Sequence, residues 1–270
     1  MKKITWLLGS FFLLTITGCF DTKEEITIAD DGSGNYVATA DMGKILSLAK
    51  TMGAENKQMK EIENMKKDTT INLIDLKDSL PDLTEAEKKL LDKATLNLKV
   101  DAAEEILSFK FSFPFSKPSD ITAIRNVLNK SKGKMLEDKM KGMMPEGEKD
   151  GDGKNMFDKE AMGKEDKGKN ENSSVDNYYN DSVAKGKISR KLNKGQYAKV
   201  ADDEDLKMLQ QMSQMGMGSN IKIVINLPKA AKKAEGKALK LSNDRKQVTI
   251  EGTLDDFFED GSYFEYEVEY

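Results

Sequence analysis

A long run of charged and small residues divides this 270-residue chain and limits where a hydrophobic core can form. Between Lys134 and Asn172, Lys, Asp, Glu and Gly occupy 26 of 39 positions, and Phe157 is the only aromatic residue. Such a composition offers too little apolar surface to offset the conformational entropy lost on folding. We therefore expect a charged linker or long exposed loop over 134–172, between an N-terminal α+β lobe (25–133) and a C-terminal β-rich lobe (173–270).

The strongest strand pattern lies in the N-terminal lobe. Over Ile106–Phe115, apolar residues alternate with mostly polar ones, and the apolar set is Leu107, Phe109, Phe111, Phe113 and Phe115. Successive side chains of a strand point to opposite faces, so this pattern predicts a strand with one aromatic face. Thr95–Asp101 alternates in the same way, and the residues between the two segments supply a turn. The two segments together predict a hairpin.

Two further local signals occur earlier in the same lobe. Asp30–Gly34 is a turn sequence between two β-prone runs, Glu25–Ala29 and Asn35–Met42, and this arrangement predicts another hairpin. Thr84 and Glu87 have the spacing of a capping box, in which each side chain bonds the backbone of the other residue. A short helix is therefore expected to begin after Thr84.

Two longer helices are predicted from apolar residues spaced three and four apart. The first begins at Ser119 or Asp120, either of which can cap it, and its apolar stripe is Ile121, Ile124, Val127 and Leu128. The second covers Asp203–Met215 in the C-terminal lobe, with Leu206, Leu209 and Met212 facing inward.

The rest of the C-terminal lobe predicts strands. A hairpin is expected over Tyr178–Leu192 with its turn near Gly186, and alternating apolar residues continue through 221–227, 248–254 and 264–270. Because free chain ends fray, a strand that includes Tyr270 must be paired within a sheet. We therefore expect an α+β fold with one or more antiparallel sheets and helices packed on one face, interrupted by the charged segment.

The first residues of the chain have the order of an export signal. Lys2 and Lys3 supply positive charge, and an uncharged, mostly apolar stretch follows over Ile4–Ile16. A helix of this length would cover only about 20 Å of a bilayer core about 30 Å thick. The segment therefore predicts a signal peptide over 1–18 rather than a permanent transmembrane helix.

The end of this segment resembles the lipobox of bacterial lipoproteins, in which an aliphatic residue and two small residues precede a cysteine. The matching residues are Ile16, Thr17, Gly18 and Cys19. The resemblance implies cleavage before Cys19, acylation of that cysteine and a membrane partner held through N-terminal acyl chains. The alternative is that Cys19 merely ends an apolar segment. Cys19 is the only cysteine, so the chain can form no internal disulfide, and residues 19–24 are expected to act as an acylated tether.

The mature start, Cys19–Glu25, also looks like the lysine-plus-acidic signal that directs some lipoproteins to the outer face of the outer membrane. A plain acidic tether is the other interpretation. Loss of Lys2 and Lys3 with the signal peptide lowers the formal net charge from -4 to -6. The two signs of charge are interspersed, which indicates solubility and argues against a nucleic-acid partner. We expect a lipid-anchored protein of the cell envelope on the outer membrane.

Three segments of the C-terminal lobe resemble the LppM-type domain of bacterial lipoproteins. A strand ends in Leu-Pro over Ile223–Pro228, a polar turn follows at Leu241–Asp244, and the next strand begins at Val248–Ile250. The Asp-Gly-Ser-Gly sequence at 31–34 is also similar. The chain differs from that family in its charged insert and in having no C-terminal membrane helix. The resemblance implies an envelope-associated module, for which affinity for lipids is one option, and it supplies no catalytic residues.

The chain contains no histidine, which removes Ser-His and Cys-His nucleophile pairs, histidine metal sites and the commonest general base. Acylation would consume Cys19, and no other motif names a catalytic residue, cofactor or metal ligand. A carboxylate pair or a Ser-Lys arrangement stays open in principle. The sequence therefore favours a non-catalytic protein.

Three functions remain as hypotheses. The first is a membrane-anchored binding or interaction module with an unknown envelope protein or lipid as its partner. The second is a carrier or sensor of an apolar, lipid-like ligand, and the third is an unrecognised hydrolase. An apolar pocket of a few hundred Å³ would suit the second, because such pockets hold small ligands. Its expected lining comes from the two aromatic strand faces: Phe109, Phe111, Phe113, Phe264 and Tyr266.

Overall fold

The computed structural model describes residues 20–44, 66–80, 82–141, 174–214 and 218–270. The signal peptide, the lipobox with Cys19 and positions 142–172 of the charged stretch lie outside these ranges. In the part of the chain that is described, no helix combines the length and the apolar character needed to cross a membrane.

The first half of the chain supplies five strands and the longest helix. The strands are β1 (Phe20–Ile28), β2 (Gly34–Asp41), β3 (Lys66–Asn72), β4 (Thr95–Asp101) and β5 (Ile106–Phe115). The helices are α3 (Glu85–Leu90), α4 (Asp120–Lys141) and the short 3₁₀ turns η1 (Leu73–Ser79) and η2 (Leu91–Lys93).

The second half contributes shorter elements. Its strands are β6 (Tyr179–Ala184), β7 (Lys187–Leu192), β8 (Ser219–Asn226), β9 (Lys233–Glu235), β10 (Leu239–Leu241), β11 (Gln247–Thr253) and β12 (Tyr266–Glu269). Its helices are α5 (Lys194–Tyr197), α6 (Glu204–Gln214) and α7 (Leu254–Glu259), with 3₁₀ turns η3 (Val175–Tyr178) and η4 (Val200–Asp202).

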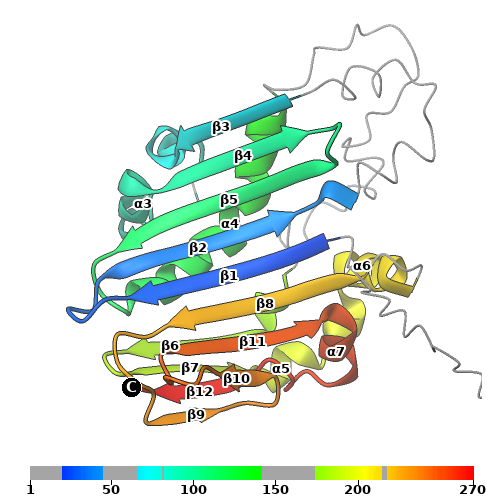
Figure 1. The fold of residues 1–270 in the computed structure, drawn as a ribbon. Coiled ribbons are helices and arrows are strands. Elements are labelled where there is room, and N and C mark those ends of the chain that lie inside the picture. Colours follow the sequence, from blue (N-terminus) through cyan, green and yellow to red (C-terminus); the bar gives the residue numbers. More distant parts are fainter. Residues whose placement is uncertain (1–19, 45–65, 81, 142–173, 215–217) are drawn as a thin grey trace, which may run out of the picture.

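An eight-stranded sheet forms the centre of the molecule, in the order β10-β11-β8-β1-β2-β5-β4-β3 (Figure 1). All neighbouring strands in it are antiparallel except β1 and β8, which run parallel with Phe20 opposite Ser219 and Thr27 opposite Asn226. This pair joins the two predicted lobes, because β1 comes from the first half of the chain and β8 from the second. The lobes therefore share one sheet.

A second sheet contains four antiparallel strands in the order β6-β7-β12-β9. Helix α4 contacts both β5 of the large sheet and β6 of the small one, and it runs behind β3, β4 and β5 in Figure 1. The chain is thus a mixed α+β protein with two sheets rich in antiparallel pairs, as the sequence predicted.

The hydrophobic core lies on one face of the large sheet, and the alternating residues place it there. The β5 residues Leu107, Phe109, Phe111, Phe113 and Phe115 are all buried, whereas Lys110 and Pro114 between them are exposed. Burial of each such side chain contributes about 1.5–3 kcal/mol, so this face holds α4 against the sheet. The opposite face of the sheet carries the polar residues of the same strands.

The local predictions for β4, β5 and α3 are confirmed. The strands have the predicted bounds, and Thr84 and Glu87 form a complete capping box at the start of α3. Helix α4 begins at Asp120, one of the two predicted starts, so Ser119 precedes its first residue. The Asp120 carboxylate accepts hydrogen bonds from the backbone N–H groups of Ser116 and Lys117 and so fixes the loop before α4.

Several boundaries differ from the sequence-based expectation. The last strand covers Tyr266–Glu269 rather than 264–270, and Tyr270 follows it with its backbone N–H bonded to the carbonyl of Gly186. Residues 20–24, expected as a tether, are already strand in β1, because neighbours on both sides hydrogen-bond that segment. Helix α4 continues to Lys141 and so covers the first eight positions of the predicted linker, which began at Lys134. The predicted strand through Leu254 ends one residue earlier, since Thr253 caps α7 with Asp256 as its partner.

Candidate functional site

Two buried arginines lie where the small sheet meets the large one. Arg125 of α4 follows Ile124 on the buried side of the helix, and Arg190 of β7 lies two residues after the buried Ile188, in the same strand phase. Each side chain is only 2% exposed. An unpaired buried charge is very costly, so both guanidinium groups require nearby carboxylates.

Arg125 binds acidic groups from both sheets. Its Nε donates to Glu24 Oε1 of β1 at 3.1 Å, and its Nη2 donates to the same oxygen and to the hydroxyl of Tyr266 at 3.2 Å. Its Nη1 lies 2.9 Å from Asp181 Oδ1 of β6, but the N–H does not point along a hydrogen bond. We interpret this last contact as ionic.

Arg190 completes the group. Its Nε and Nη2 bind the two oxygens of Asp181 at 2.9 and 3.2 Å, which is the bidentate geometry that makes Arg-carboxylate pairs strong. Its Nη1 lies 3.0 Å from Asp176 Oδ1 of η3, and its guanidinium carbon lies 5.4 Å from the centre of the Tyr179 ring. We call these five charged residues the buried charge cluster: Glu24, Arg125, Asp176, Asp181 and Arg190.

The electrostatics of the cluster keep Asp181 and the two arginines ionised. Burial alone would raise the pKa of Asp181, but the charges of Arg125 and then Arg190 outweigh it and lower that pKa to about 2. Burial alone would lower the pKa of Arg125, but Glu24 in particular raises it well above its usual value. A catalytic acid needs the opposite shift, toward neutral pH. The cluster therefore has the character of a structural ion network.

The cluster connects elements that are far apart in the sequence. Glu24 and Arg125 come from the first half of the chain, whereas Asp181 and Arg190 come from the second. The geometry thus pins the small sheet and α4 to the middle of the large sheet at β1. Among the described residues, no group of three or more acidic, His or Cys side chains is arranged to hold a metal ion.

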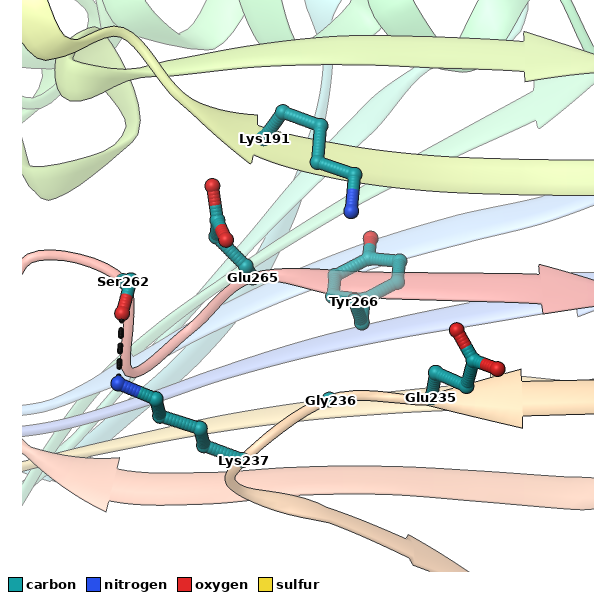
Figure 2. Close-up of a pocket in the computed structure, with 7 residues that line it drawn as sticks. All are labelled: Lys191, Glu235, Gly236, Lys237, Ser262, Glu265 and Tyr266. Carbon is teal, nitrogen blue, oxygen red and sulfur yellow. Dashed lines mark hydrogen bonds between the residues drawn. The ribbon is translucent and has the colours of Figure 1, made fainter.

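A surface pocket of about 350 Å³ opens at one end of the small sheet. Its lining residues come from the ends of β7 and β9 and from the segment that enters β12: Lys191, Glu235, Gly236, Lys237, Ser262, Glu265 and Tyr266. Figure 2 shows Lys191 and Glu235 on opposite sides of Tyr266. Because Tyr266 also accepts a hydrogen bond from Arg125, this residue connects the pocket to the buried charge cluster.

Most polar groups of the pocket have partners within the protein. Lys237 Nζ donates to Ser262 Oγ at 2.8 Å and also pairs with Asp260, and Glu265 Oε1 accepts from the backbone N–H of Leu192 at 2.7 Å (Figure 2). Lys191 makes no ion pair within the part of the chain that the structure describes. A ligand carboxylate or phosphate would therefore find one uncommitted ammonium group at Lys191.

The Ser262 and Lys237 pair does not have the electrostatics of a Ser-Lys nucleophile. A lysine general base must be neutral, which normally requires burial, but the Lys237 side chain is 59% exposed and pairs with Asp260. The hydrogen bond from Lys237 lowers the pKa of Asp260 to about 2, and Ser262 donates to that carboxylate at 2.7 Å. These contacts fix the turn before β12.

The expected apolar-pocket residues are all buried and belong to one hydrophobic core cluster. Phe109, Phe111 and Phe113 lie on the inner face of β5, and Phe264 and Tyr266 lie near the start of β12. Of these five residues, only Tyr266 lines the described pocket. Among the described aromatic pairs, none joins a β5 ring to Phe264 or Tyr266.

Sequence reasoning did not find the buried charge cluster. The alternating pattern of a strand assigns charged residues to the face in contact with solvent. Two members of the cluster instead occupy positions whose side chains point to the buried face. Glu24 precedes the buried Ile26 by two residues, and Arg190 follows the buried Ile188 by two. A charge at a position that alternation assigns to the core was the available signal.

Comparisons with known proteins add one distant structural likeness. No family model matches the chain, and neither does any curated protein. Among solved structures, the chain is similar to the NMR structure of the folded domain of the Mycobacterium tuberculosis LppM (Rv2171) protein, with 8% sequence identity and a TM-score of 0.36. That match covers 94% of this chain and 91% of that chain.

Proposed function

We propose that this protein is a lipid-anchored lipoprotein of the cell envelope and that its folded body is a non-catalytic binding or interaction module. The observation that carries the proposal is the position of the lipobox-like sequence. Ile16–Cys19 ends one residue before Phe20, where β1 enters the large sheet. Acyl chains on Cys19 would hold a folded domain at the membrane, because two or more chains give stable anchoring. The Lys23–Glu25 start leads us to place the anchor in the outer membrane.

The pocket supports a polar ligand for this module. Its side chains include two lysines, two glutamates and a serine, so a ligand there would exchange hydrogen bonds and charges rather than bury a lipid tail. We therefore favour an interaction module for polar groups over the alternative, a carrier of a lipid-like ligand.

Acylation can be tested directly on the mature protein. The parent protein should fractionate with membranes, and the mass of its N-terminal peptide should show acyl chains on Cys19. Cys19→Ser should remain unprocessed or lose its acyl chains. Thr17→Ser, which keeps a small residue at the same site, should behave like the parent. Parent protein recovered soluble and without acyl chains would refute the anchor.

The lipid-carrier alternative has its own test. Because residues 20–22 belong to β1, the protein to use is Cys19→Ser without the signal peptide 1–18, so that it begins at position 19 and keeps the whole of β1. Titration with a fluorescent fatty acid should show no saturable binding if the module binds polar ligands. Saturable binding that Phe111→Asp abolishes in a folded variant would favour the carrier instead.

A further inference from the structure

The segment that follows the proposed anchor cannot lengthen into a flexible tether. Hydrogen-bonded neighbours flank β1 on both sides, with β8 paired from Phe20 onward and β2 paired from Asp21 onward. Asp21 accepts a hydrogen bond from Asn220 at 2.8 Å, and Glu24 lies in the buried charge cluster. Detaching the first residues of β1 would break both strand ladders and expose Arg125 without its partner, which is a large cost.

The strand registers define two opposite ends of the large sheet. The anchor end contains the start of β1, the end of β2 at Asp41 and the turn between β4 and β5 at 102–105. The far end contains the turn between β1 and β2 at 29–33 and the end of β5 at Phe115. Helices α6 and α7 lie at the anchor end (Figure 1). At about 3.3 Å per residue, the nine residues of β1 separate the two ends by about 30 Å.

We infer that the anchor end of the sheet faces the lipid surface and that the protein stands upright on the membrane, with the far end about 30 Å above the headgroups. This inference rests on the proposed acylation of Cys19. With one residue between the acyl chains and a doubly paired strand, the anchor end has no freedom to leave the headgroup region. The chain direction of β1 then carries the rest of the sheet away from the membrane.

The alternative orientation is one in which the polar face of the sheet lies flat on the membrane, and the charges of that face favour it only weakly. Part of its charge is paired, since Lys23 binds Glu25 at 2.7 Å and Lys222 binds Glu251 at 3.4 Å. Lys99 and Lys110 are among its lysines that make no ion pair with the described residues. Paired charges attract an anionic surface weakly. At the anchor end, Glu104 and Glu105 are exposed, so this end meets headgroups and does not enter the hydrocarbon.

The chain is well suited to a single-label test, because its one cysteine is the acylated residue. New cysteines at exposed sites can be labelled alone: Ala103→Cys at the anchor end, Lys110→Cys at mid-height and Asp30→Cys at the far end. The acylated proteins are reconstituted into phosphatidylethanolamine and phosphatidylglycerol vesicles containing a lipid with a quencher on its headgroup. We expect most of the fluorescence to be lost at position 103, an intermediate loss at 110 and almost none at 30.

Other orders of quenching would overturn the upright orientation. Strongest quenching at 110 would show the sheet lying on its polar face, strongest quenching at 30 would show the reverse orientation, and equal quenching would show no fixed orientation. A matched control inserts ten Gly and Ser residues between Cys19 and Phe20, which gives a mean tether span of about 17 Å. This variant should still float with vesicles but lose the dependence on position. Parent protein that does not float with vesicles would refute the anchor itself, which is a separate result.

Discussion

Arg190 shows how a single buried charge depends on its partners. Replacing it with methionine leaves Asp181 with one arginine fewer and leaves Asp176 without its 3.0 Å contact. A carboxylate that stays buried without its cationic partner is an uncompensated charge and destabilises the fold. We therefore expect Arg190→Met to lower the free energy of unfolding by about 3–5 kcal/mol. Urea unfolding in the Cys19→Ser background measures it.

Two further variants make this expectation specific. Lys185→Met removes an exposed positive charge from the turn after β6 and should change stability by less than about 0.5 kcal/mol. Arg190→Met combined with Asp181→Leu should be more stable than Arg190→Met alone, because the double variant also removes the buried carboxylate. An Arg190→Met protein as stable as its parent would show that the buried charge cluster contributes nothing to the fold.

The second prediction for this cluster is that part of the protein's stability depends on ionised Asp181 and is lost in acid. Its pKa is about 2 in the folded protein, below the ordinary value of 3.8, because Arg125 and Arg190 together outweigh the effect of burial. The ionised group therefore stabilises the fold above about pH 4, and this contribution is lost as the pH falls toward about 2. Asp181→Asn should be less stable than the parent at pH 7 but lose less additional stability in acid. Unfolding free energies measured along a pH series test it, and parallel curves would contradict it.

At the scale of single elements, the capping box of α3 gives a third prediction. The hydroxyl of Thr84 accepts from the Glu87 backbone N–H, and Glu87 in turn binds Lys130 of α4 at 2.9 Å. Thr84→Ala should therefore lower the free energy of unfolding by about 1 kcal/mol. Thr84→Ser keeps the oxygen and should be nearly neutral in the same urea titration. Equal losses in the two variants would assign the effect to packing of the threonine methyl group.

The elements that sequence could predict are those whose signal is local. Alternation over 95–101 and 106–115 was enough for β4 and β5, because each strand shows one face to the core and one to solvent. The end of β11 was missed because Leu254 continues its apolar pattern. The deciding signal there was Thr253 with Asp256, a capping box that uses Asp in place of the commoner Glu or Gln.

The candidate site was less predictable than the elements, for a physical reason. A buried charge is tolerated only through partners that the fold brings together, and Glu24 meets Arg125 across 101 positions of sequence. The pocket likewise forms where the ends of β7, β9 and β12 converge. No local pattern encodes such contacts, so the sequence signals were limited to Glu24 and Arg190, two charged residues at positions that alternation assigns to the core.

At the scale of the whole molecule, the charged stretch marks a break in sequence but no break in the sheet. A stretch with few apolar residues predicts a linker, but this composition does not indicate whether the segments on either side of it pair with each other. Here β1 and β8 are neighbours although their first residues, Phe20 and Ser219, lie 199 positions apart in the sequence, and their parallel pairing has no hairpin turn to reveal it. The two predicted lobes therefore depend on each other for a complete core.

This dependence leads to a last prediction. A protease recognition sequence inserted between Asp152 and Gly153 would allow cleavage of the folded Cys19→Ser protein into two fragments, with β1 in the first and β8 in the second. The fragments should stay together on size-exclusion chromatography, since the paired strands and the buried charge cluster both span the cut. They should separate in urea, and Arg190→Met should lower the urea concentration at which they do. Fragments that elute apart in native buffer would show that each lobe folds alone.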